Sequence, residues 1–252
     1  MVYFSAACGC DRGLIRRRNE DNFYFNGYIL PCENEGLDSV MTQTGTSNQP
    51  VLFGIFDGMG GESFGNEAAY LAADVMSKRL STKPKLPEAL VDVCMNANYA
   101  ICRAAQKHGG ETMGATAVLL GLEGENAYLV NIGDSRAFLY RNGGLTQISV
   151  DHTEQLPYLW KDKPKYKPRL TQHLGIKPED MVIEPYATEI RIESGDLFLL
   201  CSDGLTDMVN EDEICLLIRE DENIVELTER LLDRAVYYGG KDNITIVLCR
   251  VL

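Results

Sequence analysis

VLFGIFDGMGG, residues 51–61, is an uninterrupted apolar run that ends in an aspartate and a cluster of glycines. A short apolar run bounded by turn residues is typical of a buried strand. The Asp57-Gly58 pair is typical of a turn, because glycine adopts left-handed backbone conformations and aspartate can hydrogen-bond to its own backbone. The segment therefore predicts a buried strand over 51–56 with a carboxylate at its end.

Similar runs lie on both sides of this strand. We expect strands at 23–30, 51–56, 115–122, 127–132, 137–140, 145–149, 197–201 and 244–251, with a weaker alternating candidate at 187–192. The three segments between 127 and 149 follow one another at hairpin spacing, which favours antiparallel pairing. Residues 31–50 and 152–181 lack such patterns and are expected to be loops.

Apolar residues recur at helical spacing in two pairs of segments. The first pair covers 68–76 and 90–105, and the second covers 211–219 and 224–238. Runs of strands with segregated helix pairs indicate an α+β fold. No linker or internal repeat divides the chain, so one domain is expected.

The composition excludes several classes of protein. The chain has 252 residues, of which 45% are hydrophobic and 24% charged, as in ordinary globular proteins. Its net charge of −13 provides no basic field, so neither nucleic acid nor membrane is an expected partner. The N-terminus lacks a signal-peptide pattern, and we expect a cytoplasmic monomer. The 8 cysteines lie mostly in apolar runs and are expected to be free thiols.

Four of the expected strands begin or end at an aspartate beside glycine or asparagine, namely Asp57, Asp134, Asp203 and Asp242. Each one alone is typical of a turn. If the strand ends converge, however, two carboxylates about 4 Å apart repel each other by about 4 kcal/mol at an effective dielectric constant of about 20. Such a cluster needs cations, and a ligand set made only of oxygen selects hard ions such as Mg²⁺ or Mn²⁺.

Near the N-terminus, Asp11-x-Gly13-x-x-Arg16-x-x-Asn19-Glu20-Asp21 places an arginine ahead of an acidic pair. The planar guanidinium suits bidentate capture of a phosphate, and the acids suit water held by a metal ion. Taken alone, the stretch is also typical of a solvated charged turn.

Six short motifs occur in order along the chain: Arg16-x-x-Asn19-Glu20-Asp21, Asp57-Gly58-Met59-Gly60-Gly61, Met113-Gly114-Ala115-Thr116, Gly133-Asp134-Ser135-Arg136, Ser202-Asp203-Gly204-Leu205 and Lys241-Asp242-Asn243. Together they resemble the metal-dependent serine/threonine protein phosphatases, the type 2C or PPM family, in its bacterial branch. The resemblance implies a single catalytic domain over 1–252 and a four-layer α-β-β-α sandwich, with two antiparallel sheets flanked by helix pairs. It also implies a flap loop at about 153–168.

The resemblance implies a pair of metal ions, Mg²⁺ or Mn²⁺. Asp57 would bridge the two ions, and the carbonyl oxygen of Gly58 would bind one of them. Asp203 and Asp242 would complete the ligand shell of one ion.

Further site residues follow from the same resemblance. Asp21, with Glu20 as a nearby alternative, would hold the second ion through water. Asp134 together with Asp203 resembles a third, weaker ion site. Arg16 would hold the phosphoryl oxygens.

The implied reaction is hydrolysis of phosphoserine and phosphothreonine in proteins by a water that two metal ions activate, without a covalent intermediate. It would reverse a serine/threonine kinase, so phosphorylated proteins, and such a kinase with its targets, are the expected partners. Animal members of the family carry DGHGG, with a histidine proposed as general acid. This chain has Met59 there, which cannot donate a proton, so a water on a metal ion is the expected donor. None of the three histidines is expected to be catalytic.

The expected flap carries Lys161, Lys163, Lys165 and Lys167 in an otherwise acidic chain. We hypothesise that these lysines attract phosphorylated peptides to the metal cleft. A solvated loop without such a role is the alternative.

Two other functions compete with this interpretation. The spacing of Cys10 and Arg16 matches the Cys-x5-Arg loop of cysteine-dependent tyrosine phosphatases, although Asp11 would raise the pKa of the thiol. The second alternative is a pseudophosphatase, in which the same fold serves as a regulatory or binding module. Such proteins usually lose the acids that bind metal, whereas this chain keeps them, which favours an enzyme.

Overall fold

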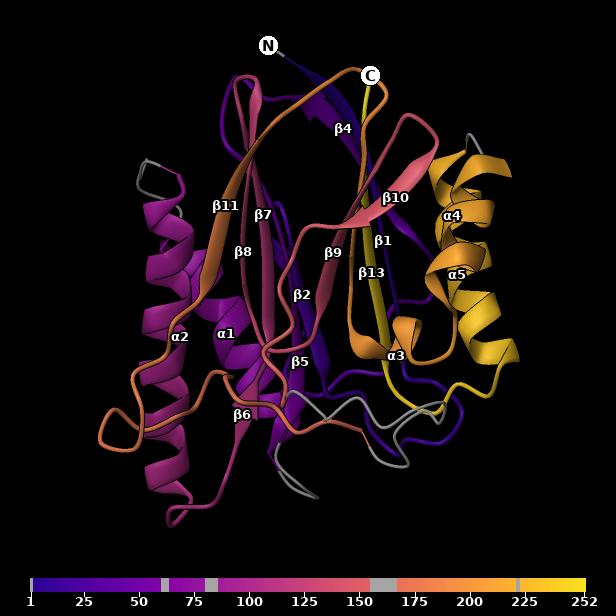
Figure 1. Ribbon diagram of the computed structural model, residues 1–252. Helices are drawn as coiled ribbons and strands as arrows, with labels where there is room; N and C mark the ends of the chain where they lie inside the picture. Colours follow the sequence, from indigo (N-terminus) through magenta and orange to yellow (C-terminus); the bar gives the residue numbers. More distant parts are fainter. Residues whose placement is uncertain (1, 60–63, 80–85, 155–166, 221–222) are drawn as a thin grey trace.

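The structure is a computed structural model that describes residues 2–59, 64–79, 86–154, 167–220 and 223–252. In these residues two antiparallel sheets lie face to face, and a pair of long helices covers the outer face of each sheet (Figure 1). The order of layers is helix, sheet, sheet, helix, which confirms the expected α+β sandwich. No helix in the described part of the chain is long and apolar enough to cross a membrane.

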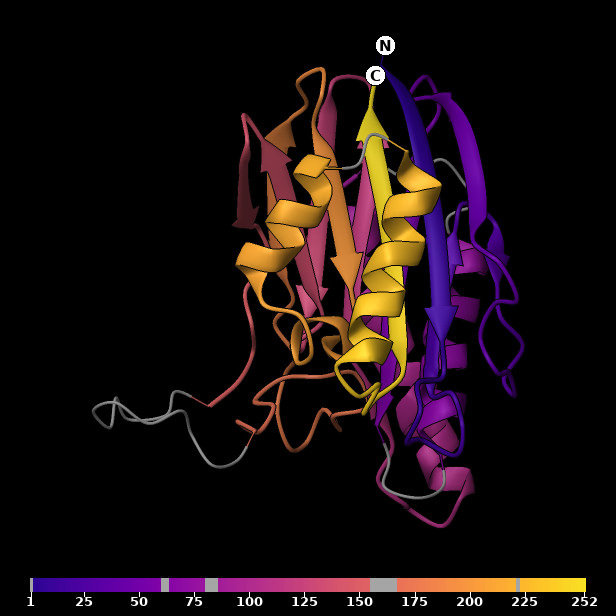
Figure 2. The same ribbon diagram turned by 90° about the vertical axis from the view of Figure 1, so that its right-hand side faces the viewer.

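One sheet contains both the first and the last strand of the chain. Its strand order is β10 (Gly144–Gln147), β9 (Arg136–Arg141), β12 (Leu197–Cys201), β13 (Ile244–Val251), β1 (Tyr3–Asp11) and β4 (Met41–Thr46). The strands β1 and β13 pair along most of their length, so the two termini lie side by side (Figure 2). Helices α4 (Glu211–Glu220) and α5 (Ile224–Tyr237) cover the outer face of this sheet.

The other sheet has β5 near its middle. Its strand order is β11 (Tyr186–Arg191), β8 (Asn126–Ile132), β7 (Ala117–Glu123), β5 (Val51–Met59), β2 (Asp21–Phe25) and β3 (Tyr28–Ile29), and the short β6 (Gly114–Ala115) pairs with the end of β5. Helices α1 (Gly65–Arg79) and α2 (Glu88–Lys107) cover its outer face (Figure 1).

Three apolar cores separate the four layers, one between the sheets and one under each helix pair. Strand β5 contributes to two of them. Phe53 and Ile55 pack between the sheets, whereas Leu52 and Phe56 pack toward α1 and α2. Because both faces of β5 are buried, residues 51–56 are apolar without alternation.

Two strands were not expected. β1 is rich in alanine, glycine and cysteine, which give a weak strand signal, and it forms because both of its faces are buried. β4 falls inside 31–50, where the prediction of a loop was wrong. Its threonines and glutamine lie at the edge of a sheet, where one side of the strand stays unpaired.

The expected strand at 23–30 is instead a hairpin of β2 and β3. Asn26 and Gly27 form the turn with φ of 43° and 113°. An Asn-Gly pair favours this tight turn because both residues accept positive φ. The other predicted strands and the four helices agree closely with the structure, and the described parts of 152–181 contain neither helix nor strand. All 8 cysteines are free.

We predict that Phe53→Ala lowers the free energy of unfolding by about 3–5 kcal/mol, the usual cost of truncating a buried phenylalanine. The Phe53 side chain is fully buried and packs against Phe4 and Phe25 between the two sheets. Urea denaturation measures the change. Tyr3→Ala is the control, because Tyr3 is 55% exposed and its loss should cost far less. An equal loss in both variants would contradict the assigned core.

Candidate active site

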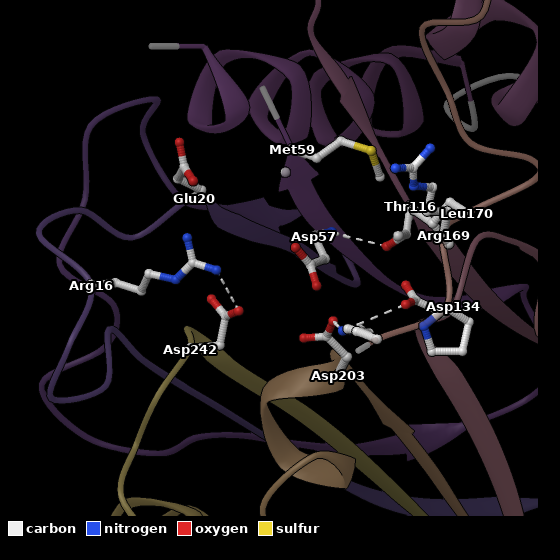
Figure 3. A pocket seen from close by; sticks show the side chains of 13 residues that line it. Arg16, Glu20, Asp57, Met59, Thr116, Asp134, Arg169, Leu170, Asp203 and Asp242 are labelled. Atoms are coloured by element: carbon white, nitrogen blue, oxygen red, sulfur yellow. Dashed lines mark hydrogen bonds and ion pairs between the residues drawn. The ribbon is translucent and has the colours of Figure 1, made fainter. Parts of the chain in front are cut away.

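All expected site residues except Asp21 line one cleft, which lies at the end of the sandwich where β5, β12 and the start of β13 come together (Figure 1). The cleft has a volume of about 400 Å³. The cleft is lined by Arg16, Glu20, Asp57, Gly58, Met59, Thr116, Asp134, Lys167, Pro168, Arg169, Leu170, Asp203 and Asp242. Figure 3 shows Asp57 at the centre, with Asp242, Asp203 and Asp134 around it.

Asp57 is held at the end of β5. Its backbone N–H donates to the hydroxyl of Thr116 at 3.2 Å, and its carbonyl accepts from the Thr116 N–H at 2.9 Å. Burial raises the pKa of Asp57 well above its usual value, and the charges of Asp21, Asp134 and Asp242 raise it further. Its carboxylate is therefore held among other carboxylates in a place that favours a bound cation.

Asp21 lies directly across from Asp57 in the pairing of β2 with β5. It is 2% exposed and does not line the cleft. The hydroxyls of Ser202 and Thr245 donate to its Oδ2 at 2.8 and 2.6 Å. Burial raises the pKa of Asp21 to about 7, although these two hydrogen bonds oppose the rise.

Glu20, the alternative to Asp21, does line the cleft. Its carbonyl accepts from the N–H of Gly58 at 3.1 Å, which brings the backbone of β5 against it. A Cβ at Gly58 would collide with the carbonyl oxygens of Glu20 and Gly65, so only glycine fits there. Burial raises the pKa of the Glu20 carboxyl, and the nearby Arg16 lowers it in part.

Arg16 reaches the cleft from the loop after β1 and donates to Asp242 Oδ2 at 2.7 Å (Figure 3). The neighbouring Asn243 fixes this loop. Its side chain donates to the carbonyls of Arg12 and Arg18 at 2.8 and 3.0 Å and accepts from the N–H of Glu20 at 2.8 Å. The sequence motif contained Asn243, but its positioning role became visible only in the structure.

Asp203 begins the short helix α3 (Asp203–Thr206) and lies between Asp242 and Asp134 in the view of Figure 3. Its two oxygens differ. Oδ1 is buried without a hydrogen-bond partner, whereas Oδ2 bonds to the ammonium group of Lys167. A buried carboxylate oxygen without a donor is costly, and a cation in the cleft would satisfy it.

The donor set fits hard divalent ions, because the described lining of the cleft offers carboxylate and carbonyl oxygens and neither histidine nor cysteine. As the side chains lie, however, no three His, Cys, Asp or Glu residues in the described chain converge closely enough to hold an ion by themselves. An ion here therefore needs further oxygens, for which the Gly58 carbonyl and water are suited.

Among the residues that the structure describes, no thiol and no histidine lines the cleft. Cys10 is 2% exposed, and burial, together with the charge of Asp21, raises the pKa of its thiol to about 12. A thiol of this kind is not a phosphate-binding nucleophile at neutral pH, so the cysteine-dependent alternative is wrong. His152 is tied to Gly133 by hydrogen bonds of 2.9 and 3.2 Å.

Of the expected flap lysines, Lys167 lies in the cleft, whereas Lys161, Lys163 and Lys165 fall outside the described residues. Lys167 was expected to attract substrate. In the structure its ammonium contacts Asp203, Asp134 at 3.6 Å and Asp207 at 3.2 Å.

Comparison with known proteins identifies the family of this chain. The family model described as Protein phosphatase 2C matches residues 26–157 and 162–244. Over 253 residues the chain is 30% identical to the serine/threonine phosphatase stp of Listeria monocytogenes, covering 94% of this chain and 92% of that protein. It is also 30% identical to the serine/threonine protein phosphatase PstP of Mycobacterium tuberculosis, covering 98% of this chain and 45% of PstP. The chain belongs to the protein phosphatase 2C family and is a serine/threonine protein phosphatase.

Solved structures give the same fold. The catalytic domain of PstP, crystallised in complex with two manganese ions, superposes with a TM-score of 0.79 at 27% identity and covers 100% of both chains. PppA, described as a regulatory component of the type VI secretion system in Pseudomonas aeruginosa, superposes with a TM-score of 0.78 at 26% identity, covering 99% of this chain and 98% of PppA.

We predict that the metal-free protein loses stability as the pH rises from about 4 to about 7. The pKa of Asp21 is 3.8 in the unfolded chain and about 7 in the folded one, so the folded chain keeps a proton that the unfolded chain releases. Stability is then present at low pH and is lost, by a few kcal/mol, across this interval. Thermal unfolding in EDTA at a series of pH values measures the effect.

Asp21→Asn is the matched variant, since an amide oxygen can still accept from Ser202 and Thr245. The variant should lose less stability over the same interval, with a remainder that comes from Asp57, Glu20 and Asp134, whose pKa values burial also raises. Identical pH profiles for the variant and the parent would contradict the assignment.

Proposed function

We propose that this phosphatase hydrolyses phosphoserine and phosphothreonine in proteins with two divalent metal ions, and that it reverses a serine/threonine kinase. One observation carries the proposal: Asp57, Asp203 and Asp242 surround a single cleft with Arg16 at its rim. The two manganese ions in the PstP complex support two ions of this type here. A cytoplasmic location and a monomeric state stay predictions.

The proposed ligands come from three parts of the chain. Asp57 would bridge the ions, and the carbonyl of Gly58 would add a neutral oxygen. Asp203 and Asp242 would complete one ion's shell, for which the unpartnered Oδ1 of Asp203 is suited. Bound ions would supply the Lewis acid and the activated water that hydrolysis needs.

Glu20 is the better placed of the two acids offered for the second ion, because it lines the cleft and Asp21 does not. Asp21 acts through its neighbours instead. Its buried carboxylate, opposite Asp57 in the β2–β5 pair, adds negative charge behind the ion pair and binds Ser202 and Thr245.

Arg16 would bind the phosphoryl oxygens and offset the charge that spreads over them during in-line transfer. Its guanidinium is exposed enough to turn toward a ligand, with 47% of the side chain accessible, and Asp242 holds its orientation.

The absence of a covalent intermediate is supported by the described lining of the cleft, which contains no thiol and one hydroxyl group. Among the described lining residues, Thr116 carries the hydroxyl, and it is already engaged by the Asp57 N–H and by Ser135 at 2.6 Å. Met59 lines the cleft at the position of the family's histidine and carries no proton. We therefore assign no side-chain acid, and water protonates the leaving oxygen.

The first test is hydrolysis of a phosphothreonine peptide with Mn²⁺, with Mg²⁺ and with EDTA, beside the Cys10→Ser variant. We expect turnover that requires a divalent ion and is unchanged by Cys10→Ser, since this thiol is buried away from the cleft. Activity that survives EDTA would contradict the metal-dependent mechanism. A folded protein inactive with both metals would favour a binding module on the same fold.

Arg16→Ala should lower kcat/KM for the phosphopeptide by about 10²–10³-fold, the usual effect of removing one donor to a developing anion. Arg17→Ala is the matched control, because Arg17 is a neighbouring exposed arginine that does not line the cleft. Steady-state kinetics at saturating Mn²⁺ compares the two. Equal, small effects of both substitutions would remove Arg16 from the phosphate site.

A further inference from the structure

Lys167 makes an unusual set of contacts at the edge of the cleft. Its ammonium bonds to Asp203 and lies 3.2 Å from Asp207 and 3.6 Å from Asp134. The ion pairs that the structure describes for these three carboxylates are all made with Lys167. Asp134 and Asp203 are also the pair that the family resemblance implies for a third metal ion.

A second, smaller cavity of about 130 Å³ lies behind this lysine. Asp134, Asp203 and Lys167 line both cavities, so the lysine side chain stands between them. The further acid of the smaller cavity, Asp151, already binds Arg136 at 2.6 Å. Among the described ion pairs of this cavity, Arg136 therefore neutralises Asp151, and Lys167 neutralises the carboxylates of Asp134, Asp203 and Asp207.

The backbone beside Lys167 is tied to the strand end that carries Asp134. Thr153 pairs with Leu170, and the N–H of Glu154 donates to the carbonyl of Arg169 at 2.9 Å. His152, next in the chain, bonds through its N–H to the carbonyl of Gly133 at 2.9 Å. The backbone segment that follows Lys167 is therefore hydrogen-bonded to residues 152–154, and these are hydrogen-bonded to Gly133, which precedes Asp134.

The two oxygens of Asp203 divide between two cations in this arrangement. Oδ2 faces Lys167, and the buried Oδ1 has no partner and is left for an ion in the main cleft. A divalent ion between Asp134 and Asp203 would have to share this space with the ammonium, and like charges so close repel each other strongly.

We propose that Lys167 is the resident cation of the Asp134–Asp203 site and takes the place of a third divalent ion, so that this phosphatase binds two ions. The proposal rests on the proposed two-metal function and deepens it. Lys167 is a positioning residue, since it neutralises Asp203 and holds it in place for the ion on the other side.

The test is the number of Mn²⁺ ions bound per chain, measured by equilibrium dialysis and elemental analysis for the wild type and three variants. Lys167→Met removes the ammonium, Lys167→Arg keeps a cation, and Lys177→Met removes an exposed lysine that does not line the cleft. We expect two ions for the wild type, Lys167→Arg and Lys177→Met, and three for Lys167→Met.

A second readout does not depend on bound metal. In EDTA, Lys167→Met should unfold about 2–4 °C below Lys177→Met, because three carboxylates lose their cation, and Mn²⁺ should abolish this difference. Equal ion numbers for Lys167→Met and the wild type would overturn the proposal and leave the two-metal function standing. Three ions in the wild type would also overturn it. No ion in the wild type would overturn both.

Discussion

Repulsion among buried carboxylates is the constraint on which the rest of this structure depends. Asp57 and Asp21 face each other across two paired strands, and burial raises the pKa of both side chains. Burial and mutual repulsion disfavour the charged form of both carboxylates in this position. The register of β2 against β5 is set by large buried side chains on both faces of these strands, because a one-residue slip would exchange the side chains packed between the sheets with those packed under α1 and α2. Apolar packing therefore holds the acids together, and the repulsion that results is what gives the cleft its affinity for cations.

The site also depends on the closure of the chain. Its residues come from the loop after β1, the end of β5, the start of α3 and the turn before β13. The pairing of β1 with β13 brings the first and last of these together, and Asn243 then fixes them by bonding to both sides of the Arg16 loop. A fragment without either terminal strand would lose Arg16 or Asp242 from the cleft. This explains why motifs spread from residue 16 to residue 243 act as one site.

Apolar runs and helical periodicity predicted most strands and all four long helices, because they are strong local signals. The family resemblance implied the four layers and the acids of the cleft, although Asp21 does not line it. The sequence did not predict β1 or β4, whose residues have weak strand propensity and are held by their neighbours. It also could not separate Glu20 from Asp21. Glu20 directly precedes β2 and Asp21 is its first residue, and which of the two side chains meets the cleft is decided by the sheet packing. The Asn26-Gly27 pair, by contrast, is a recognisable sequence signal for a tight turn, although a single strand was expected over 23–30.

Lys167 shows a second limit of motif-based prediction. As one of several lysines in a loop, it suggested attraction of substrate, because the sequence gives the charge of a lysine but not the position of its ammonium group. In the structure its position is specific: it pairs with Asp203, Asp134 and Asp207. A tethered ammonium differs from a divalent ion in two ways. It brings one positive charge in place of two, and its occupancy does not depend on the free ion concentration. Carboxylates neutralised in this way stay in place whatever the metal supply, so in the proposed mechanism the response of the cleft to metal is left to the ions that Asp57 would bridge.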